Sequence, residues 1–237
     1  MKRSLNILLL LFMIALETSA QQWWSAISED KTKGTFIDKR DNQVYGWVKI
    51  GPQIWMSQNL DVNEFIEVKN GRSTGVVIEK LCYNNKEENC NIYGGLYTDI
   101  VIDMYTGLPG SRSICPEGWH LPALQEWQML TEFLGGADYA AGELKEAGTV
   151  HWRKSNRGAT NSSGFTALPG GYCMLEENNL AYAGLFIKAF FWTSSEGFSP
   201  MFLRKEFRVV TLVKNDNKMD MNRSLGMSAC SVRCIKD

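Results

Sequence analysis

Short apolar stretches separated by turn residues occupy the first part of the chain. Residues 35–37, 44–50 and 53–56 are rich in β-branched and aromatic side chains, and turn residues such as Gly51-Pro52 separate them. Runs of this length and composition, bounded by turn residues, are typical of β-strands. Bulky side chains occur on both faces of 44–50, so we expect this strand to be covered on each side.

In the middle of the chain, apolar residues are spaced as in a helix rather than gathered in short runs. Residues 84–91 are polar and predict a solvated loop. From 124 to 133, apolar side chains recur every three or four positions, which is the spacing of a helix with one buried face. Pro122 suits the first turn of this helix, and the glycine pair at 135–136 suits its end. Residues 140–147 predict a second, shorter helix.

After the helices, the pattern returns to strands and glycine-rich turns. Apolar runs at 165–168, 190–192, 207–213 and 231–234 predict four further strands. Strands, then helices, then strands again favour an α+β domain over a doubly wound α/β fold. The chain has no internal repeat and no Pro- or Ser-rich linker, so we expect a single domain from 33 to 237.

The first twenty residues have the pattern of a secretory signal peptide. Residues 1–3 are Met-Lys-Arg, residues 5–16 are almost entirely apolar, and small residues precede Gln21. A helix of twelve residues reaches only about 18 Å, which is too short for a bilayer core. We therefore expect cleavage after Ala20, a flexible leader over 21–32 and no transmembrane segment afterwards. No Cys lies near the cleavage point, so we expect a secreted, periplasmic or cell-surface protein that is not a lipoprotein.

Composition and charge are those of a globular protein. Apolar residues make up 44% of the chain and charged residues 22%, and there are eight Trp, so a core can form. The net charge is −1, which provides no broad basic field for nucleic acid. We therefore expect no nucleic-acid partner, and the sequence does not indicate an oligomeric state.

The predicted export determines how the six cysteines are interpreted. An even number in an oxidising compartment indicates disulfides, although sequence alone leaves every pairing of the six open. The chain has only two His and no C-x-x-C spacing, so a structural zinc site is not expected. The six are Cys82, Cys90, Cys115, Cys173, Cys230 and Cys234.

Seven short motifs stand out along the chain. They are 34–41 (GTFIDKRD), 50–60 (IGPQIWMSQNL), 93–97 (YGGLY), 115–122 (CPEGWHLP), 164–172 (GFTALPGGY), 192–196 (WTSSE) and 231–237 (SVRCIKD). In this order, the set resembles the Fibrobacter succinogenes major paralogous domain family. The resemblance covers roughly residues 33–237, and seven motifs in the same order make a chance likeness improbable.

The resemblance implies a C-type-lectin-like fold, akin to the domain of formylglycine-generating enzymes. Such a domain would have short twisted antiparallel strands, two helices, long loops and disulfide staples. The family pattern implies the pairs Cys82 with Cys90 and Cys115 with Cys234. The two remaining cysteines, Cys173 and Cys230, depart from that pattern and are the candidates for a third bridge. Family members are exported or surface proteins without a well-defined activity, so fold alone assigns no function.

An enzyme of the copper- and thiol-dependent oxidase type is the catalytic alternative. It needs a reactive cysteine pair, and only Cys173 and Cys230 could provide one, outside any motif of those enzymes. The chain has no G-x-S-x-G nucleophile motif. His120, at a strand-to-helix turn, favours a structural role, and His151 favours a surface or groove position. We therefore expect a protein that is not an enzyme and that needs no cofactor.

Binding of an extracellular glycan or protein is the alternative that the sequence favours. The sugar-binding tripeptides of calcium-dependent C-type lectins are absent, and the acidic residues at 216–220 lack the glycine of a calcium loop, so we expect no metal. A calcium-independent site would present flat aromatic rings together with polar groups. The candidate ligand-binding residues are Trp152, Tyr172, Tyr182 and Trp192.

Overall fold

The computed structural model describes residues 32–62, 64–66, 76–78, 80–106, 114–176, 179–199, 204–226 and 228–237. Lys33–Asp237 forms one compact unit. The predicted signal peptide and nearly all of the predicted leader lie outside the described residues. Within the described ranges, no helix is both long enough and apolar enough to span a bilayer.

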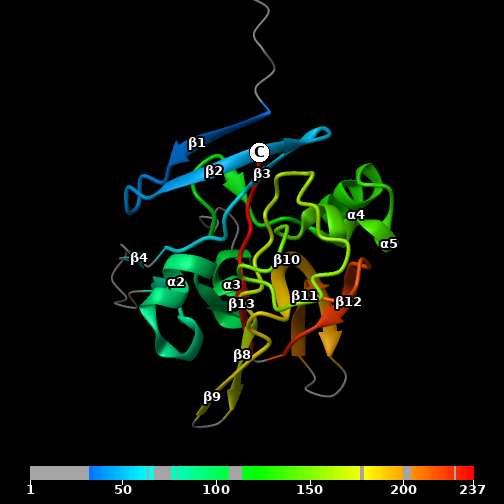
Figure 1. Cartoon of the computed structure of the whole chain (residues 1–237). Helices are drawn as coiled ribbons and strands as arrows, with labels where there is room; N and C mark the ends of the chain where they lie inside the picture. The colour runs from blue at the N-terminus through cyan, green and yellow to red at the C-terminus, as the bar shows by residue number, and fades with distance from the viewer. Residues whose placement is uncertain are drawn as a thin grey trace, which may run out of the picture. The chain divides into compact units, whose positions relative to one another are not determined.

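A five-stranded antiparallel sheet joins the two ends of this unit (Figure 1). Its three N-terminal strands confirm the predictions at 35–37, 44–50 and 53–56. The C-terminal strand is inserted between β3 and β7, because Ile235 pairs with Trp55 on one side and with His120 on the other. In sheet order, the strands are β1 (Lys33–Ile37), β2 (Val44–Ile50), β3 (Gln53–Met56), β14 (Ile235–Lys236) and β7 (Trp119–His120).

A seven-stranded sheet forms the second layer. Its strands pair antiparallel except β10 and β13, which are parallel at Phe191 and Ser231. The strands, in order, are β12 (Asp220–Ser224), β11 (Arg204–Val213), β10 (Lys188–Ser199), β13 (Ser228–Ser231), β8 (Tyr172–Glu176) and β9 (Asn179–Ala183), and β6 (Leu96–Thr98) also pairs with β13. A separate small sheet pairs β4 (Glu64–Ile66) with β5 (Val76–Ile78). The predicted strand at 231–234 is wrong except for Ser231, which ends β13, and residues 232–234 connect β13 to β14.

The helices confirm the α+β class and extend it. The two predicted helices correspond to α4 (Leu124–Phe133) and α5 (Ala137–Leu144), and the described residues contain two more, α2 (Glu87–Tyr93) and α3 (Asp99–Thr106). The predicted loop at 84–91 is therefore wrong over much of its length. A short 3-10 turn, η1 (Tyr83–Asn85), leads into α2, whose buried residues Cys90 and Tyr93 hold it to the domain.

Helix α4 begins where side chains satisfy its first backbone donors. The Ala123 N–H donates to Glu126 Oε2 at 2.8 Å, and the Leu124 N–H donates to Ser195 Oγ at 2.9 Å. The first N–H groups of a helix have no partner within the helix, so these two bonds fix its start. Trp127 and Leu130 are fully buried on its inner face, as the spacing predicted.

Strand β10 separates two hydrophobic clusters. Successive side chains of a strand point to opposite faces, so Phe190 and Trp192 enter one cluster and Phe191 enters the other. The first cluster is shared with α3 and with Trp119, and the second with α4 and α5. Both faces of this central strand are therefore covered, and each cluster anchors one group of helices.

The predicted strand at 165–168 is wrong, and a turn replaces it. Thr166 has a φ of +56°, which lies in the left-handed region that β-branched residues rarely adopt. The side chain of Asn161 holds this turn, because its Oδ1 accepts from the Thr166 N–H at 2.8 Å. Only an isolated bridge, between Ala167 and Lys145, remains of strand pairing here.

Two fully buried cations stabilise the turns around this segment. Arg233 donates from Nε and Nη2 to Asn59 Oδ1 at 2.9 and 2.6 Å, and from Nη1 to the Phe165 carbonyl at 2.6 Å. Lys145 Nζ donates to four backbone carbonyls, at residues 157, 213, 214 and 216, over distances of 2.8 to 3.4 Å. Buried polar groups must find hydrogen-bond partners, and these two find them in backbone carbonyls and in the side-chain amide of Asn59.

The disulfides are those that the family resemblance implied. Cys82 is bonded to Cys90, and Cys115 is bonded to Cys234, across 8 and 119 positions of sequence. The proposed third bridge is wrong, because Cys173 and Cys230 are free and buried. Cys173 is opposite Ala229 in the β8–β13 pair, so the next residue, Cys230, points to the other face of the sheet. Two thiols on opposite faces cannot meet.

Candidate functional site

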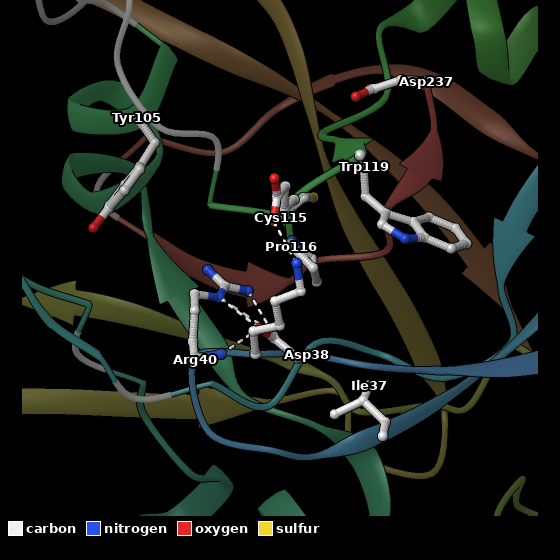
Figure 2. A pocket seen from close by; sticks show the side chains of 11 residues that line it. Ile37, Asp38, Arg40, Tyr105, Cys115, Pro116, Trp119 and Asp237 are labelled. Atoms are coloured by element: carbon white, nitrogen blue, oxygen red, sulfur yellow. Dashed lines mark hydrogen bonds and ion pairs between the residues drawn. The ribbon is translucent and has the colours of Figure 1, made fainter.

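A concave surface lies between the β1–β2 hairpin and the segment that follows Cys115 (Figure 2). It encloses about 870 Å³ and is lined by residues 37–40 and 115–119, together with Tyr105 and Asp237. We call it the hairpin cleft. Its volume falls in the range of small-molecule binding sites, roughly 300–1,000 Å³.

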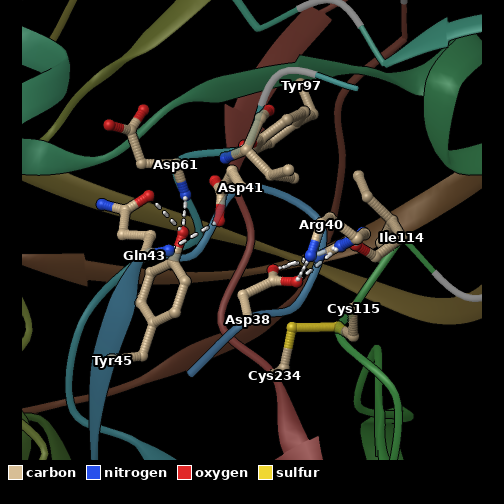
Figure 3. A network of polar contacts seen from close by, with 11 residues as sticks. Asp38, Arg40, Asp41, Gln43, Tyr45, Asp61, Tyr97, Ile114, Cys115 and Cys234 are labelled. Atoms are coloured by element: carbon tan, nitrogen blue, oxygen red, sulfur yellow. Dashed lines mark hydrogen bonds and ion pairs between the residues drawn. A yellow bond between two sulfur atoms is a disulfide. The ribbon is translucent and has the colours of Figure 1, made fainter. Parts of the chain in front are cut away.

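An ion pair braces one wall of the hairpin cleft. Asp38 is buried and accepts from Arg40 Nε at 3.0 and 3.1 Å and from Nη2 at 2.7 Å. The remaining amino group of Arg40, Nη1, donates to the Ile114 carbonyl at 2.8 Å (Figure 3). A two-pronged contact between a guanidinium and a carboxylate is strong and directional. It therefore fixes the hairpin against the chain just before Cys115.

A disulfide and a backbone bond fix the opposite wall. Cys115 is bonded to Cys234 (Figure 3). Cys234 directly precedes β14, which pairs with β7. The Asp237 N–H donates to the Gly118 carbonyl at 3.1 Å. One wall is thus held by an ion pair and the other by a disulfide and a backbone hydrogen bond, so the cleft is preformed.

Charged side chains lie at the mouth of the cleft. Lys39 Nζ and Glu117 Oε2 are 3.1 Å apart, and both side chains are 83% exposed. Exposed pairs of this kind contribute only about 0–1 kcal/mol to stability, so each partner can exchange its contact for one with a ligand at little cost.

His120 links the cleft to α4 and is held by two carboxylates. Its Nδ1 lies 2.6 Å from Asp237 Oδ1, and its Nε2 lies 2.8 Å from Glu126 Oε1. The hydrogen bond to Glu126 is the main cause that raises the pKa of His120 above its ordinary value. With both ring nitrogens engaged, the imidazole has a structural role, as the sequence suggested, and is not available as a general base.

A second polar network lies behind the β1–β2 turn and is also structural (Figure 3). The Tyr45 hydroxyl donates to Gln43 Oε1 at 2.9 Å and accepts from the Asp61 N–H at 2.9 Å. Burial raises the pKa of this hydroxyl well above its ordinary value. The carboxylate of Asp61 pairs with Lys80 Nζ at 3.0 Å. Each group has a protein partner, so the network provides order rather than a reactive group.

The free thiols are far from reactive surroundings. Cys173 and Cys230 have no exposed area, and burial raises the pKa of both, most strongly for Cys230. A reactive cysteine needs a lowered pKa and access to solvent. Neither condition holds here.

The four rings proposed as ligand-binding residues do not form one surface. Trp152 and Trp192 are core residues, 1% and 0% exposed, and their indole N–H groups donate to the carbonyls of Ala167 and Tyr97. Their burial leaves little ring area for a ligand, and a role for either in binding stays a prediction. Tyr172 and Tyr182 are half-buried, and their role in binding stays a prediction.

Sequence reasoning missed the residues that line the hairpin cleft. Asp38, Lys39 and Arg40 belong to the motif at 34–41, and Glu117 belongs to the motif at 115–122, yet each was interpreted only as part of a family signature. The useful signal was the Asp-x-Arg spacing at a strand end, where an acid and a base two residues apart can pair around a turn.

Comparison with known protein families identifies one family for this chain. No curated protein and no solved structure matches the chain. The sequence model of the Fibrobacter succinogenes major domain matches residues 48–236, which is most of the compact unit and includes β3, both disulfides and β14. The chain therefore belongs to the Fibrobacter succinogenes major domain family.

Proposed function

We propose that this chain is an exported, non-catalytic binding module with a C-type-lectin-like fold, and that the hairpin cleft is its ligand site. The observation that carries the proposal is the preformed cleft, which combines rigid walls with an exchangeable ion pair at its mouth. Preorganised walls reduce the ordering cost of binding.

The chemistry of the cleft suits a polar, extended ligand. Its mouth offers an ammonium, Lys39, and two carboxylates, Glu117 and Asp237, beside the apolar side chain of Ile37, which is 61% exposed. Hydroxyl and amide groups pair equally well with such donors and acceptors. A glycan chain or an extended peptide segment from a cell surface meets these requirements.

The arrangement of the thiols supports binding over oxidation. An oxidase of the formylglycine-generating type would need two cysteines together in an open cleft, whereas Cys173 and Cys230 point to opposite faces of a sheet. Two disulfides are compatible with an oxidising compartment, and they support export. N-terminal sequencing of the protein secreted by a bacterial host should begin at Gln21.

A glycan array and a pull-down of cell-surface proteins, both with the mature chain, test the function. We expect one class of ligand to bind, and binding to weaken about tenfold in the double variant Lys39→Gln/Glu117→Gln, as expected when charge-assisted hydrogen bonds are lost. Lys86→Gln is the matched control, since Lys86 is an exposed lysine paired with Glu88 outside the cleft. Unchanged binding in the double variant would remove the cleft from the proposal, and a folded sample that binds neither class would refute the function.

A further inference from the structure

A second groove, apart from the hairpin cleft in its lining residues, lies over the loop at 149–153. It encloses about 480 Å³ and includes Leu185 and Phe186 from the turn before β10. The two segments are joined, because the Arg153 N–H donates to the Phe186 carbonyl at 2.8 Å. The buried ring of Trp152 anchors the loop from below through its bond to the Ala167 carbonyl. The groove therefore has fixed sides.

Apolar side chains are presented to solvent along this groove. Val150 is 81% exposed and Phe186 is 46% exposed. Phe186 has a φ of +66°, a conformation that costs a bulky residue about 1–3 kcal/mol and that glycine would adopt freely. Residues held in such conformations cluster at functional sites, and the Phe186 ring is also placed by an edge-on contact with Tyr93, with centroids 6.2 Å apart.

His151 also lines this groove, and one nitrogen of its imidazole, Nε2, can contact a ligand. His151 Nδ1 is hydrogen-bonded to Glu146 Oε1 at 2.8 Å, and the ring of Tyr93 packs edge-on against the imidazole with centroids 5.7 Å apart. These contacts fix the orientation of the imidazole. Across the described parts of the chain, no hydrogen bond uses Nε2, and His151 lines the groove.

Positive charge lies beside this groove in a chain whose net charge is −1. Arg153 lines the groove, and Lys154 and Arg157 follow it in the sequence. Arg153, Lys154 and Arg157 are exposed, and none of them forms an ion pair with a described residue. Lys214 adds a further cation, since its Nζ donates to the Lys154 carbonyl at 3.2 Å. The acidic groups nearby are already engaged, because Glu146 pairs with His151 and the carboxylate of Asp216 accepts from the Lys218 N–H.

We propose that this groove binds a carboxylate-bearing sugar, a uronic acid unit of an acidic polysaccharide. The apolar face of the sugar ring would lie on Phe186 and Val150, and its carboxylate would accept from Arg153. Because His151 Nδ1 donates to Glu146, His151 Nε2 would accept from a hydroxyl of the sugar. A guanidinium and a carboxylate match in geometry and charge. The volume suits one or two sugar units. The proposal concerns a separate site and does not depend on the ligand of the hairpin cleft.

Isothermal titration calorimetry of the mature chain with tri-galacturonate tests this, with the uncharged galactose trimer as comparison. We expect saturable binding of the acidic trimer only, weakening as salt is raised. Arg153→Gln should reduce affinity about tenfold, the effect of one charge-assisted hydrogen bond, and Phe186→Ala should also weaken binding. Lys39→Gln, which removes an equivalent charge in the hairpin cleft, should leave it unchanged.

Chemical-shift perturbation by NMR gives a second measurement that does not depend on the variants. The amides of 149–153 and 185–186 should move when the acidic trimer is added. Absence of binding at millimolar concentration, equal affinity for the neutral trimer, or full affinity in a folded Arg153→Gln variant would each overturn the proposal.

Discussion

The two disulfides close loops of very different length, and this difference gives a quantitative prediction. Cys82 and Cys90 are separated by 8 positions, whereas Cys115 and Cys234 are separated by 119. The change is to replace each pair by two alanines, which removes the covalent bond without leaving a thiol that could form new bridges. The described unit is otherwise identical in the two variants, so each serves as the control for the other.

The magnitude follows from the entropy that a cross-link removes from the unfolded chain. For these separations, it amounts to about 2.5 kcal/mol for the short loop and about 4.9 kcal/mol for the long one. Cys115 and Cys234 are also both buried, so each alanine there loses packing worth about a further 1 kcal/mol. A domain has a total stability of about 5–15 kcal/mol, so the long-loop variant should be close to unfolding at room temperature.

Urea denaturation followed by circular dichroism measures both free energies by linear extrapolation, under conditions that keep the remaining disulfide oxidised. We expect the variant that lacks Cys115 and Cys234 to lose at least about 2 kcal/mol more than the variant that lacks Cys82 and Cys90. If the short-loop variant loses as much or more, loop entropy does not govern these bridges and the reasoning is wrong. Helix α2, which contains Cys90, would then be the part that limits stability.

Three further predictions concern titratable and buried groups. His120→Gln should destabilise the protein by less than about 1 kcal/mol, because the pair is part-exposed. Because the pKa of His120 is raised in the folded protein, the stability lost on substitution should be greatest below pH 6.5 and should vanish as pH rises through the folded-state pKa. Urea titrations from pH 5 to pH 9 measure this loss. Lys145→Met should lower the free energy of unfolding by about 3 kcal/mol, because the carbonyls of 157 and 216 lose the ammonium as donor while those of 213 and 214 keep a backbone donor, and an unchanged value would contradict that account. Iodoacetamide should modify Cys173 and Cys230 only after denaturation, and rapid labelling of the folded protein, read by mass spectrometry, would revive the oxidase.

The strands and helices that the sequence predicted well are those with strong local signals. The strands at 44–50 and 53–56 and the helix from Leu124 combine periodic apolar residues with turn or capping residues, and tertiary contacts agree with them. Helix α2 has a polar sequence, and its order comes from the bridge at Cys90, which no local pattern reveals.

The errors have a common physical origin in contacts between distant residues. The run at 165–168 is apolar enough for a strand, yet the buried side chain of Arg233, distant in sequence, takes the Phe165 carbonyl that strand pairing would use. Likewise, the rings of Trp152 and Trp192 look alike in sequence whether they face solvent or core, and only the packed structure separates the two cases. The hairpin cleft could not be predicted, because its walls, 37–40 and 115–119, come from segments that are distant in the sequence.

The ammonium of Lys145 occupies the kind of place where many extracellular domains hold a calcium ion, surrounded by main-chain oxygens from two loops. Unlike an ion, it is covalently attached and cannot be chelated, diluted or exchanged. The geometry of these loops is therefore independent of the mineral content of the medium, and EDTA should leave the melting temperature of the protein unaltered.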